Sequence, residues 1–337
     1  MFAYTIRRAI SGVAMLVVMS LVTFLLFFAM PIDPARFTCG KNCSPALIEQ
    51  NRKALGYDQP APVQWANFMQ GIFVGRDYPA DPALKITAPQ TIVHCPAPCL
   101  GYSPQRTSLV SKSIGQALPV SASLALAAFV MWIIGGVSLG ILAALKKGTI
   151  LDRSVVGISL IFYAFPTFFI GLLLYQYIAI QWKLVPIPSW VPFADNPVQW
   201  AQQLFLPALT LALFFMAGYV RLTRAFVLES LSEDYLRTAK AKGLSPTKIL
   251  FKHTMRAALT PLVTIAALDL GGLLGGAIIT ENVFNYPGLG KLAVESATTY
   301  DLPTTVGIVL LLATFIIAAN IIVDVLYAFI DPRVKLA

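Results

Sequence analysis

Four cysteines form two pairs with the same spacing, and their thiols are the clearest reactive groups in the chain. The pairs are Cys39 with Cys43 and Cys95 with Cys99, and both fall in one long polar segment. Outside the cytoplasm, disulfides are the expected state of such thiols. Three connectivities are possible, and spacing does not choose among them. A cross-link between the pairs would pin distant parts of the segment, whereas local bridges would close two small loops.

The other reactive side chains indicate neither a metal centre nor a catalytic site. His94 adjoins Cys95, but this spacing is not a strong zinc pattern, and we expect no metal site. The chain has neither the phosphate-binding pattern G-x-x-x-x-G-K-[ST] nor H-E-x-x-H. His253 has no Ser and Asp partners in one compartment. We therefore expect no enzyme activity, and any uphill transport would need a partner or an ion gradient.

Composition and apolar runs predict an all-α integral membrane protein with six transmembrane helices. The 337 residues are 57% hydrophobic and 12% charged, whereas soluble domains carry about 25% charged residues. Six runs are long enough to cross a bilayer: residues 9–30, 118–145, 155–180, 204–227, 259–280 and 304–329. They define three domains: 1–30 with the first helix, a long external loop 31–116 with both cysteine pairs, and a five-helix core 117–337.

Basic residues set the orientation and explain the net charge of +9. Two arginines precede the first span and two lysines follow the second, whereas the two short external loops hold only Lys183 and Lys291. Lys and Arg accumulate on the cytoplasmic side of membrane spans. We therefore expect both termini in the cytoplasm, a lipid bilayer as the environment and no nucleic-acid partner.

Three features inside the predicted spans bear on function. Pro166 interrupts the third span and predicts a kink or, alternatively, a hinge. Asp269 lies within the fifth span, where a charge is costly, and is our candidate for a residue of a translocation path. Small residues four apart allow close helix approach, within the subunit or in a dimeric pore, and the same span has two such pairs: Gly271 with Gly275, and Gly272 with Gly276.

The longest polar segment between the C-terminal spans, residues 233–261, has a helix break at its centre. Residues 235–242 predict a short helix, and Gly243 suits the left-handed position that ends one. Ser245 and Pro246 fit the N-cap and first position of the next helix. The segment carries six basic residues: Arg237, Lys240, Lys242, Lys248, Lys252 and Arg256. A helix–turn–helix projecting from the positive side of a membrane protein is shaped to contact a partner.

This segment resembles the cytoplasmic EAA loop of ABC importer permeases through the run R-T-A-x-A-K-G-L-S. The longer run DYLRTAKAKGLS resembles the dipeptide and oligopeptide branch, specifically its B-type permease subunit. Further runs resemble this branch in the same order: residues 55–60, 271–276, 281–284, 286–290, 320–324 and 331–333. Residues 79–106 lie outside the resemblance, and Arg237 stands where the family often has Glu.

The resemblance implies a type I permease fold in a bacterial cytoplasmic membrane, with no cofactor in this chain because partner subunits bind ATP and Mg²⁺. It implies a second permease subunit, two ATP-binding subunits or one fused pair, and an extracytoplasmic substrate-binding protein. It places Glu281 at the outer mouth of the path. Within a coupling loop of residues 231–258, it assigns the ATPase contact to eleven residues: Asp234, Tyr235, Arg237, Thr238, Ala239, Lys240, Ala241, Lys242, Gly243, Leu244 and Ser245.

Other readings stay open at this point. Substrates of the branch include dipeptides, oligopeptides, nickel chelates and haem, and the sequence does not choose among them. An ion-coupled secondary transporter or channel is the alternative function, although such proteins usually have several deep ionisable residues and an internal repeat. Here only Asp269 lies deep within a span. A binding or structural role of the external loop is a third reading, which leaves the basic loop unexplained.

Overall fold

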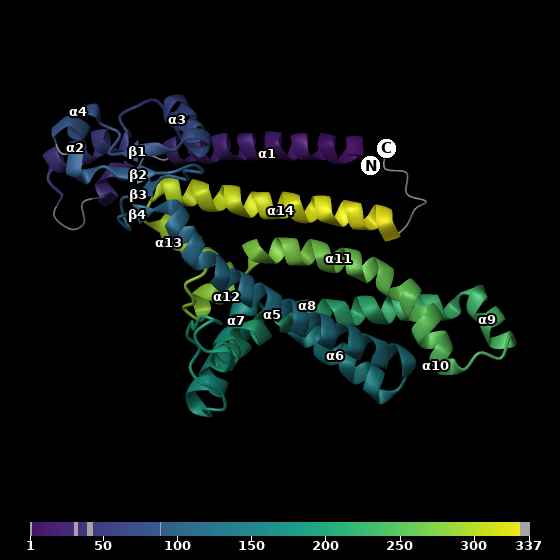
Figure 1. Ribbon diagram of the computed structural model, residues 1–337. Coiled ribbons are helices and arrows are strands. Elements are labelled where there is room, and N and C mark those ends of the chain that lie inside the picture. The colour runs from purple at the N-terminus through teal and green to yellow at the C-terminus, as the bar shows by residue number, and fades with distance from the viewer. Residues whose placement is uncertain (1, 30–32, 39–42, 88, 331–337) are drawn as a thin grey trace. The chain divides into compact units, whose positions relative to one another are not determined.

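The computed structural model describes residues 2–29, 33–38, 43–87 and 89–330, which are mostly helical (Figure 1). The chain divides into two compact units. The first comprises residues 1–119 and 288–317, and the second comprises residues 120–287 and 318–337. The long helices α5 and α14 contribute residues to both units. The domain limits predicted at residues 30 and 116 stay a prediction.

The first unit contains the predicted first span and the segment predicted to be external. Phe24 of the first helix packs against Phe68, with ring centroids 5.4 Å apart. Two antiparallel strand pairs form, with Arg76 opposite Cys95 and Tyr102 opposite Leu109. The elements are α1 (Phe2–Ala29), η1 (Pro34–Thr38), α2 (Pro45–Leu55), α3 (Ala61–Val74), β1 (Arg76–Tyr78), α4 (Pro82–Thr87), η2 (Pro89–Thr91), β2 (Val93–Cys95), β3 (Tyr102–Ser103), β4 (Ser108–Leu109), α13 (Leu289–Thr298) and the first part of α14 (Leu302–Ile330).

Polar contacts fasten the β3–β4 turn to the segment between α13 and α14. The hydroxyl of Ser103 donates to the Asp301 carboxylate, and Thr304 Oγ1 donates to the same carboxylate at 2.7 Å. Gln105 Nε2 donates to the Thr299 carbonyl at 3.1 Å. Asp301 is buried, and this burial raises the pKa of its carboxyl. The long polar segment is therefore packed against the C-terminal part of its unit, which the sequence did not predict.

The disulfide connectivity in this segment is local. Cys95 is bonded to Cys99 with an S–S distance of 2.02 Å, and both residues are buried. Cys43 is also disulfide-bonded, whereas Cys39 lies outside the described residues. The bridge within the second pair excludes a cross-link from Cys95 or Cys99 to the first pair.

Replacing Cys95 and Cys99 by serine is expected to loosen this segment without removing the chain from the membrane. A loop this short contributes about 2 kcal/mol through its disulfide, and the spans do not depend on it. We expect faster proteolysis between residues 79 and 106, measured on intact membranes, with unchanged resistance of the chain to alkaline extraction. Loss of membrane insertion would contradict this prediction.

The second unit holds the other candidate spans, except that the span of α14 begins in the first unit. Over the part of the chain that the structure describes, five helices are long and apolar enough to cross a membrane, and a bent pair makes a sixth span if counted as one. The elements of the second unit are most of α5 (Val110–Leu145), α6 (Ile150–Ala164), α7 (Thr167–Leu174), η3 (Tyr175–Gln181), α8 (Pro197–Ser232), α9 (Asp234–Ala241), α10 (Pro246–Lys248), η4 (Ile249–Thr254), α11 (Met255–Gly276), α12 (Ile278–Val283) and the end of α14.

The predicted third span is broken rather than merely kinked. Helix α6 ends at Ala164, Pro166 precedes α7, and the two halves meet at an angle of 102°. Proline cannot donate a backbone hydrogen bond and clashes with the preceding turn, which explains the break. Whether this break serves as a hinge stays a prediction.

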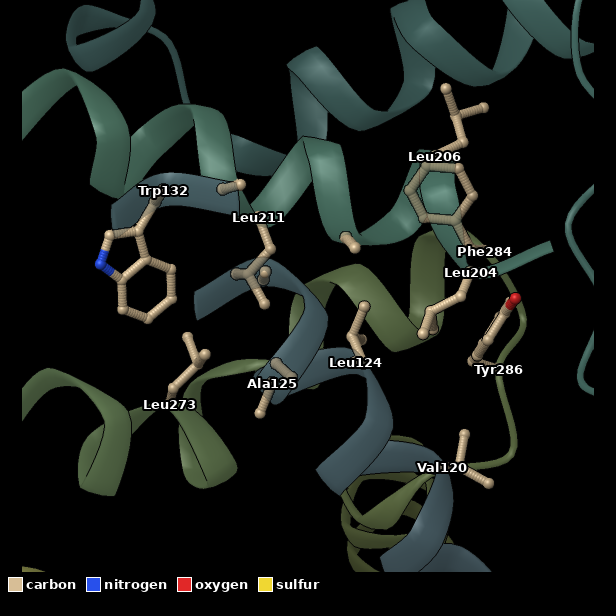
Figure 2. Close-up of a cluster of buried hydrophobic side chains, with 14 of the residues drawn as sticks. Val120, Leu124, Ala125, Trp132, Leu204, Leu206, Leu211, Leu273, Phe284 and Tyr286 are labelled. Carbon is tan, nitrogen blue, oxygen red and sulfur yellow. The ribbon is translucent and has the colours of Figure 1, made fainter. Parts of the chain in front are cut away.

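Large buried side chains from α5, α8, α11 and the segment that follows α12 form the core of the second unit (Figure 2). The indole ring of Trp132 stacks on Phe215 with centroids 4.5 Å apart. Beside this core, α5 and α8 approach closely through glycines of α5. A Cβ atom on Gly136 would lie 2.6 Å from Tyr219 Cβ, and one on Gly140 would lie 2.8 Å from the Val220 carbonyl oxygen. These two glycines are four residues apart, the spacing that permits close helix contact.

The glycine pairs predicted to form such a contact in the fifth span have different surroundings. Gly271 lies against Ala319 of α14, whereas nothing surrounds the position of a Cβ on Gly272 within 4 Å. Gly275 and Gly276 are helical. The contact with α8 that depends on glycines four apart thus comes from α5, a helix in which no such pair was predicted from the sequence.

Candidate coupling site and translocation-path residues

The candidate coupling element is a short helix held between two long ones. Helix α8 ends at Ser232, and Glu233 adopts an extended conformation with ψ of 141° before α9 begins at Asp234. An acidic residue in the first turn of α9 and Lys240 in its last turn both suit the helix dipole. In Figure 1, α9 and α10 form the end of the second unit that lies away from α7 and α12.

Helix α9 has a buried inner face and an exposed outer face. Leu236 and Ala239, three residues apart, are buried against Ile249. This spacing puts both on one side of a helix. The outer face leaves most of the predicted contact residues exposed: Asp234, Tyr235, Arg237, Thr238, Lys240, Ala241 and Lys242. The helix is therefore fixed to its own subunit while presenting charged and aromatic side chains outward.

The turn after α9 is a Schellman motif centred on Gly243. Its φ is +74°, the left-handed region that favours glycine. The Gly243 N–H donates to the Lys240 carbonyl at 2.9 Å, and the Leu244 N–H donates to the Ala239 carbonyl at 3.3 Å. Leu244 also packs in the same cluster as Ala239, the apolar contact that accompanies this motif. The predicted helix end is therefore confirmed.

The predicted start of the next helix is also confirmed, but the helix continues farther than expected. Ser245 Oγ accepts from the Lys248 N–H at 3.4 Å, and Pro246 occupies the first turn. The chain then stays helical through α10, the π-helical segment η4 and α11, up to Gly276. Within the described residues, the chain from the turn after α9 to the end of the span is therefore one continuous run of helical segments.

An ion pair between a buried carboxylate and a partly exposed guanidinium, which the sequence analysis missed, connects α6 to α8. Arg224 Nε donates to Asp152 Oδ1 at 2.7 Å, and its Nη2 donates to Oδ2 at 2.9 Å. The Gly148 N–H donates to the same Oδ2 at 2.9 Å. Asp152 is buried, and a bidentate pair of this kind is geometrically specific. Neither residue stands out in the sequence, because the two partners are 72 positions apart.

The two predicted path residues lie at separate places in the second unit. Tyr219 Oη donates to Asp269 Oδ2 at 2.6 Å, joining α8 to α11. Glu281, in α12, is fully buried, and Ser121 Oγ of α5 donates to its Oε1 at 2.5 Å. Both carboxylates therefore face other helices of the same subunit. Their roles in a translocation path stay predictions.

Comparisons with known families cover nearly the whole chain. The family described as binding-protein-dependent transport system inner membrane component matches residues 136–336. A companion family, described as the N-terminal part of a membrane component of these systems, matches residues 1–125. Residues 79–106, which lay outside the motif resemblance, fall within the second match.

Full-length relatives and a solved structure resemble the chain. A protein of Brucella abortus (strain 2308), assigned to a peptide transport system as a permease protein, is 33% identical over 335 residues, covering 99% of each chain. The dipeptide transport system permease protein DppB of Escherichia coli (strain K12) is 31% identical over 359 residues, again covering 99% of each. A chain of the MetNI methionine ABC transporter in an inward-facing conformation shares the fold, with a TM-score of 0.51 at 17% identity over 66% of this chain and 97% of that one.

Proposed function

The chain belongs to the binding-protein-dependent transport system inner membrane component family, and from this membership we propose that it forms half of the translocation path for di- and oligopeptides. It is the permease subunit of an ABC importer and a multi-pass inner membrane protein. Permease components of this family have no ATPase activity and bind no cofactor, so ATPase partners must supply the energy. The family assignment decides against an ion-coupled secondary transporter or channel.

The proposed coupling runs through α9 and the Gly243 turn. The observation that supports it most is the division of α9 into a buried inner face and an exposed outer face between two long helices. The outer face would contact an ATP-binding subunit, and closure of the ATPase pair would move α8 and α11 together. The proposed assembly contains a second permease subunit, two ATP-binding subunits or one fused pair, and an extracytoplasmic substrate-binding protein. Both termini would be cytoplasmic.

Two lines support the finer parts of the proposal. Full-length relatives are named as peptide and dipeptide permeases, which supports peptides as the substrate. The basic residues of the α9 region and the two lysines after α5 support a cytoplasmic position of these two segments. Asp269 and Glu281 are proposed path residues, which would require the helices around them to separate during transport.

Affinity purification of the tagged chain in mild detergent tests the assembly. We expect ATP-binding subunits and a second six-helix permease to co-purify and to be identified by mass spectrometry. The purified complex in proteoliposomes, supplied with its binding protein, should import a labelled dipeptide only when ATP is present. A chain that purifies alone, where other membrane complexes survive, would contradict the assembly. ATP-dependent uptake of another solute but no peptide would contradict the substrate.

A further inference from the structure

A groove of about 390 Å³ opens beside α9, between the end of α8 and the start of α11. Its lining is apolar along α11, with the small residues Ala257, Ala258 and Pro261, and Phe226 of α8 adds a large apolar side chain. The ring of Tyr235, which is 44% exposed, forms one wall. The small residues leave room for the aliphatic stem of a long side chain, while its head group reaches the rim.

The rim of the groove is acidic, although the surrounding loop is basic. Glu229 and Glu233 line the groove, are exposed and lie four residues apart at the end of α8. Among the residues that the structure describes, no Lys, Arg or His forms an ion pair with either carboxylate. Like charges at this spacing repel each other, and carboxylates at a helix C-terminus oppose the helix dipole. The isolated subunit thus holds an arrangement that a bound cation would stabilise.

A serine hydroxyl provides a second, independent feature. Ser230 lines the same groove and is 7% exposed as a residue, and its Oγ makes no hydrogen bond within the described part of the chain and is not among the fully buried side-chain atoms. The lone pairs of this hydroxyl can therefore accept from a donor bound in the groove. The groove therefore combines two carboxylates, a hydroxyl acceptor and an aromatic ring, which together match an ammonium or, better, a planar guanidinium group.

We propose that this groove binds an arginine or lysine side chain of the ATP-binding subunit that contacts α9. The proposal rests on the proposed function and adds Glu229, Ser230 and Glu233 to the coupling contact. The occupant belongs to the ATPase because the groove adjoins the outer face of α9. Anionic lipid headgroups would be repelled by its carboxylates. The loop around this acidic groove is basic. A partner surface with the opposite charge pattern, a basic side chain among acidic ones, would therefore bind in only one alignment.

The test measures how firmly the assembled complex holds its ATPase subunits. The double variant Glu229→Gln and Glu233→Gln keeps the shape of both side chains and removes their charges. We expect it to retain about tenfold less ATPase than the parent chain after washes at increasing salt. The positive side chain of the ATPase subunit would then lie in the groove without a carboxylate partner. The matched control, the double variant Asp58→Asn and Asp195→Asn, removes two charges as well, from exposed positions outside the groove, and we expect parental retention.

The outcomes separate this inference from the function on which it rests. If the parent chain retains no ATPase, the proposed function is contradicted. The proposal that an ATPase side chain binds in the groove is then contradicted as well. If the parent retains ATPase and the double variant retains as much as the control, only the groove proposal is overturned. In a second measurement, Ala257→Cys labelled with a maleimide benzophenone should cross-link to the ATPase subunit. Cross-linking to lipid or to another permease chain instead would also overturn it.

Discussion

A Gly243→Val variant is expected to assemble with its ATPase partners and yet to lose most ATP-driven uptake. Gly243 has a φ of +74°, and nothing lies within 4 Å of the position of a Cβ. The cost of a side chain there is thus a matter of backbone conformation and not of crowding. A left-handed conformation costs an ordinary residue about 1–2 kcal/mol, and a β-branched residue more. Valine would therefore shift the turn and rotate α9 away from its present orientation.

The matched control is Gly243→Asn, because asparagine tolerates the left-handed region. We expect uptake within about twofold of the parent for asparagine and a decrease of about tenfold or more for valine, given that 1.4 kcal/mol corresponds to a factor of ten. Gly243→Pro should behave like valine, since proline fixes φ near −65° and removes the N–H that bonds to the Lys240 carbonyl. ATPase activity and uptake are measured on the same purified complexes. Normal uptake by an assembled valine variant would refute the proposed role of the turn.

The parts of the coupling element that follow from local sequence signals could be predicted. The end of α9 depends on one glycine, and the start of α10 depends on an adjacent Ser-Pro pair. In both cases the residue that forms the cap and the groups that it satisfies lie within a few positions of each other. Such signals need no knowledge of tertiary contacts. The apolar runs likewise predicted most of the long helices, because a span is defined by its own length and hydrophobicity.

Features that depend on distant partners could not be predicted in this way. The ion pair between Asp152 and Arg224 joins residues 72 positions apart, and neither residue alone indicates the other. The choice among three disulfide connectivities depended on how the strands around Cys95 fold. Pro166 predicted a disturbance in its helix, but the size of the bend, 102°, depends on what the two halves pack against. Whether a given glycine lies in a helix contact likewise depends on which distant helix packs against it.

Replacing Gly140 by leucine is expected to prevent the second unit from folding stably. A Cβ at this position would lie 2.6 Å from Thr223 Cβ and 2.8 Å from the Val220 carbonyl oxygen. A backbone oxygen cannot rotate away, so α5 and α8 would have to separate along their contact. Overpacking a tight core costs up to about 3 kcal/mol, and the separation would also disturb the core around Trp132. We expect a lower yield of monodisperse protein and an apparent melting temperature several degrees below that of the parent.

The control Gly218→Leu tests whether this effect belongs to the α5–α8 contact. Gly218 lies on α8, and nothing surrounds the position of its Cβ within 4 Å, so the same substitution should leave the melting temperature near that of the parent. Equal destabilisation by both variants would mean that leucine disturbs any position in these helices and would contradict the proposed importance of the contact.

The effects of Gly140→Leu and Gly243→Val should differ in kind. Gly140→Leu should lower the amount of folded chain, whereas Gly243→Val should lower uptake per assembled complex. A loss of uptake in the folded fraction of Gly140→Leu, at normal ATPase retention, would instead place the α5–α8 contact in the coupling pathway.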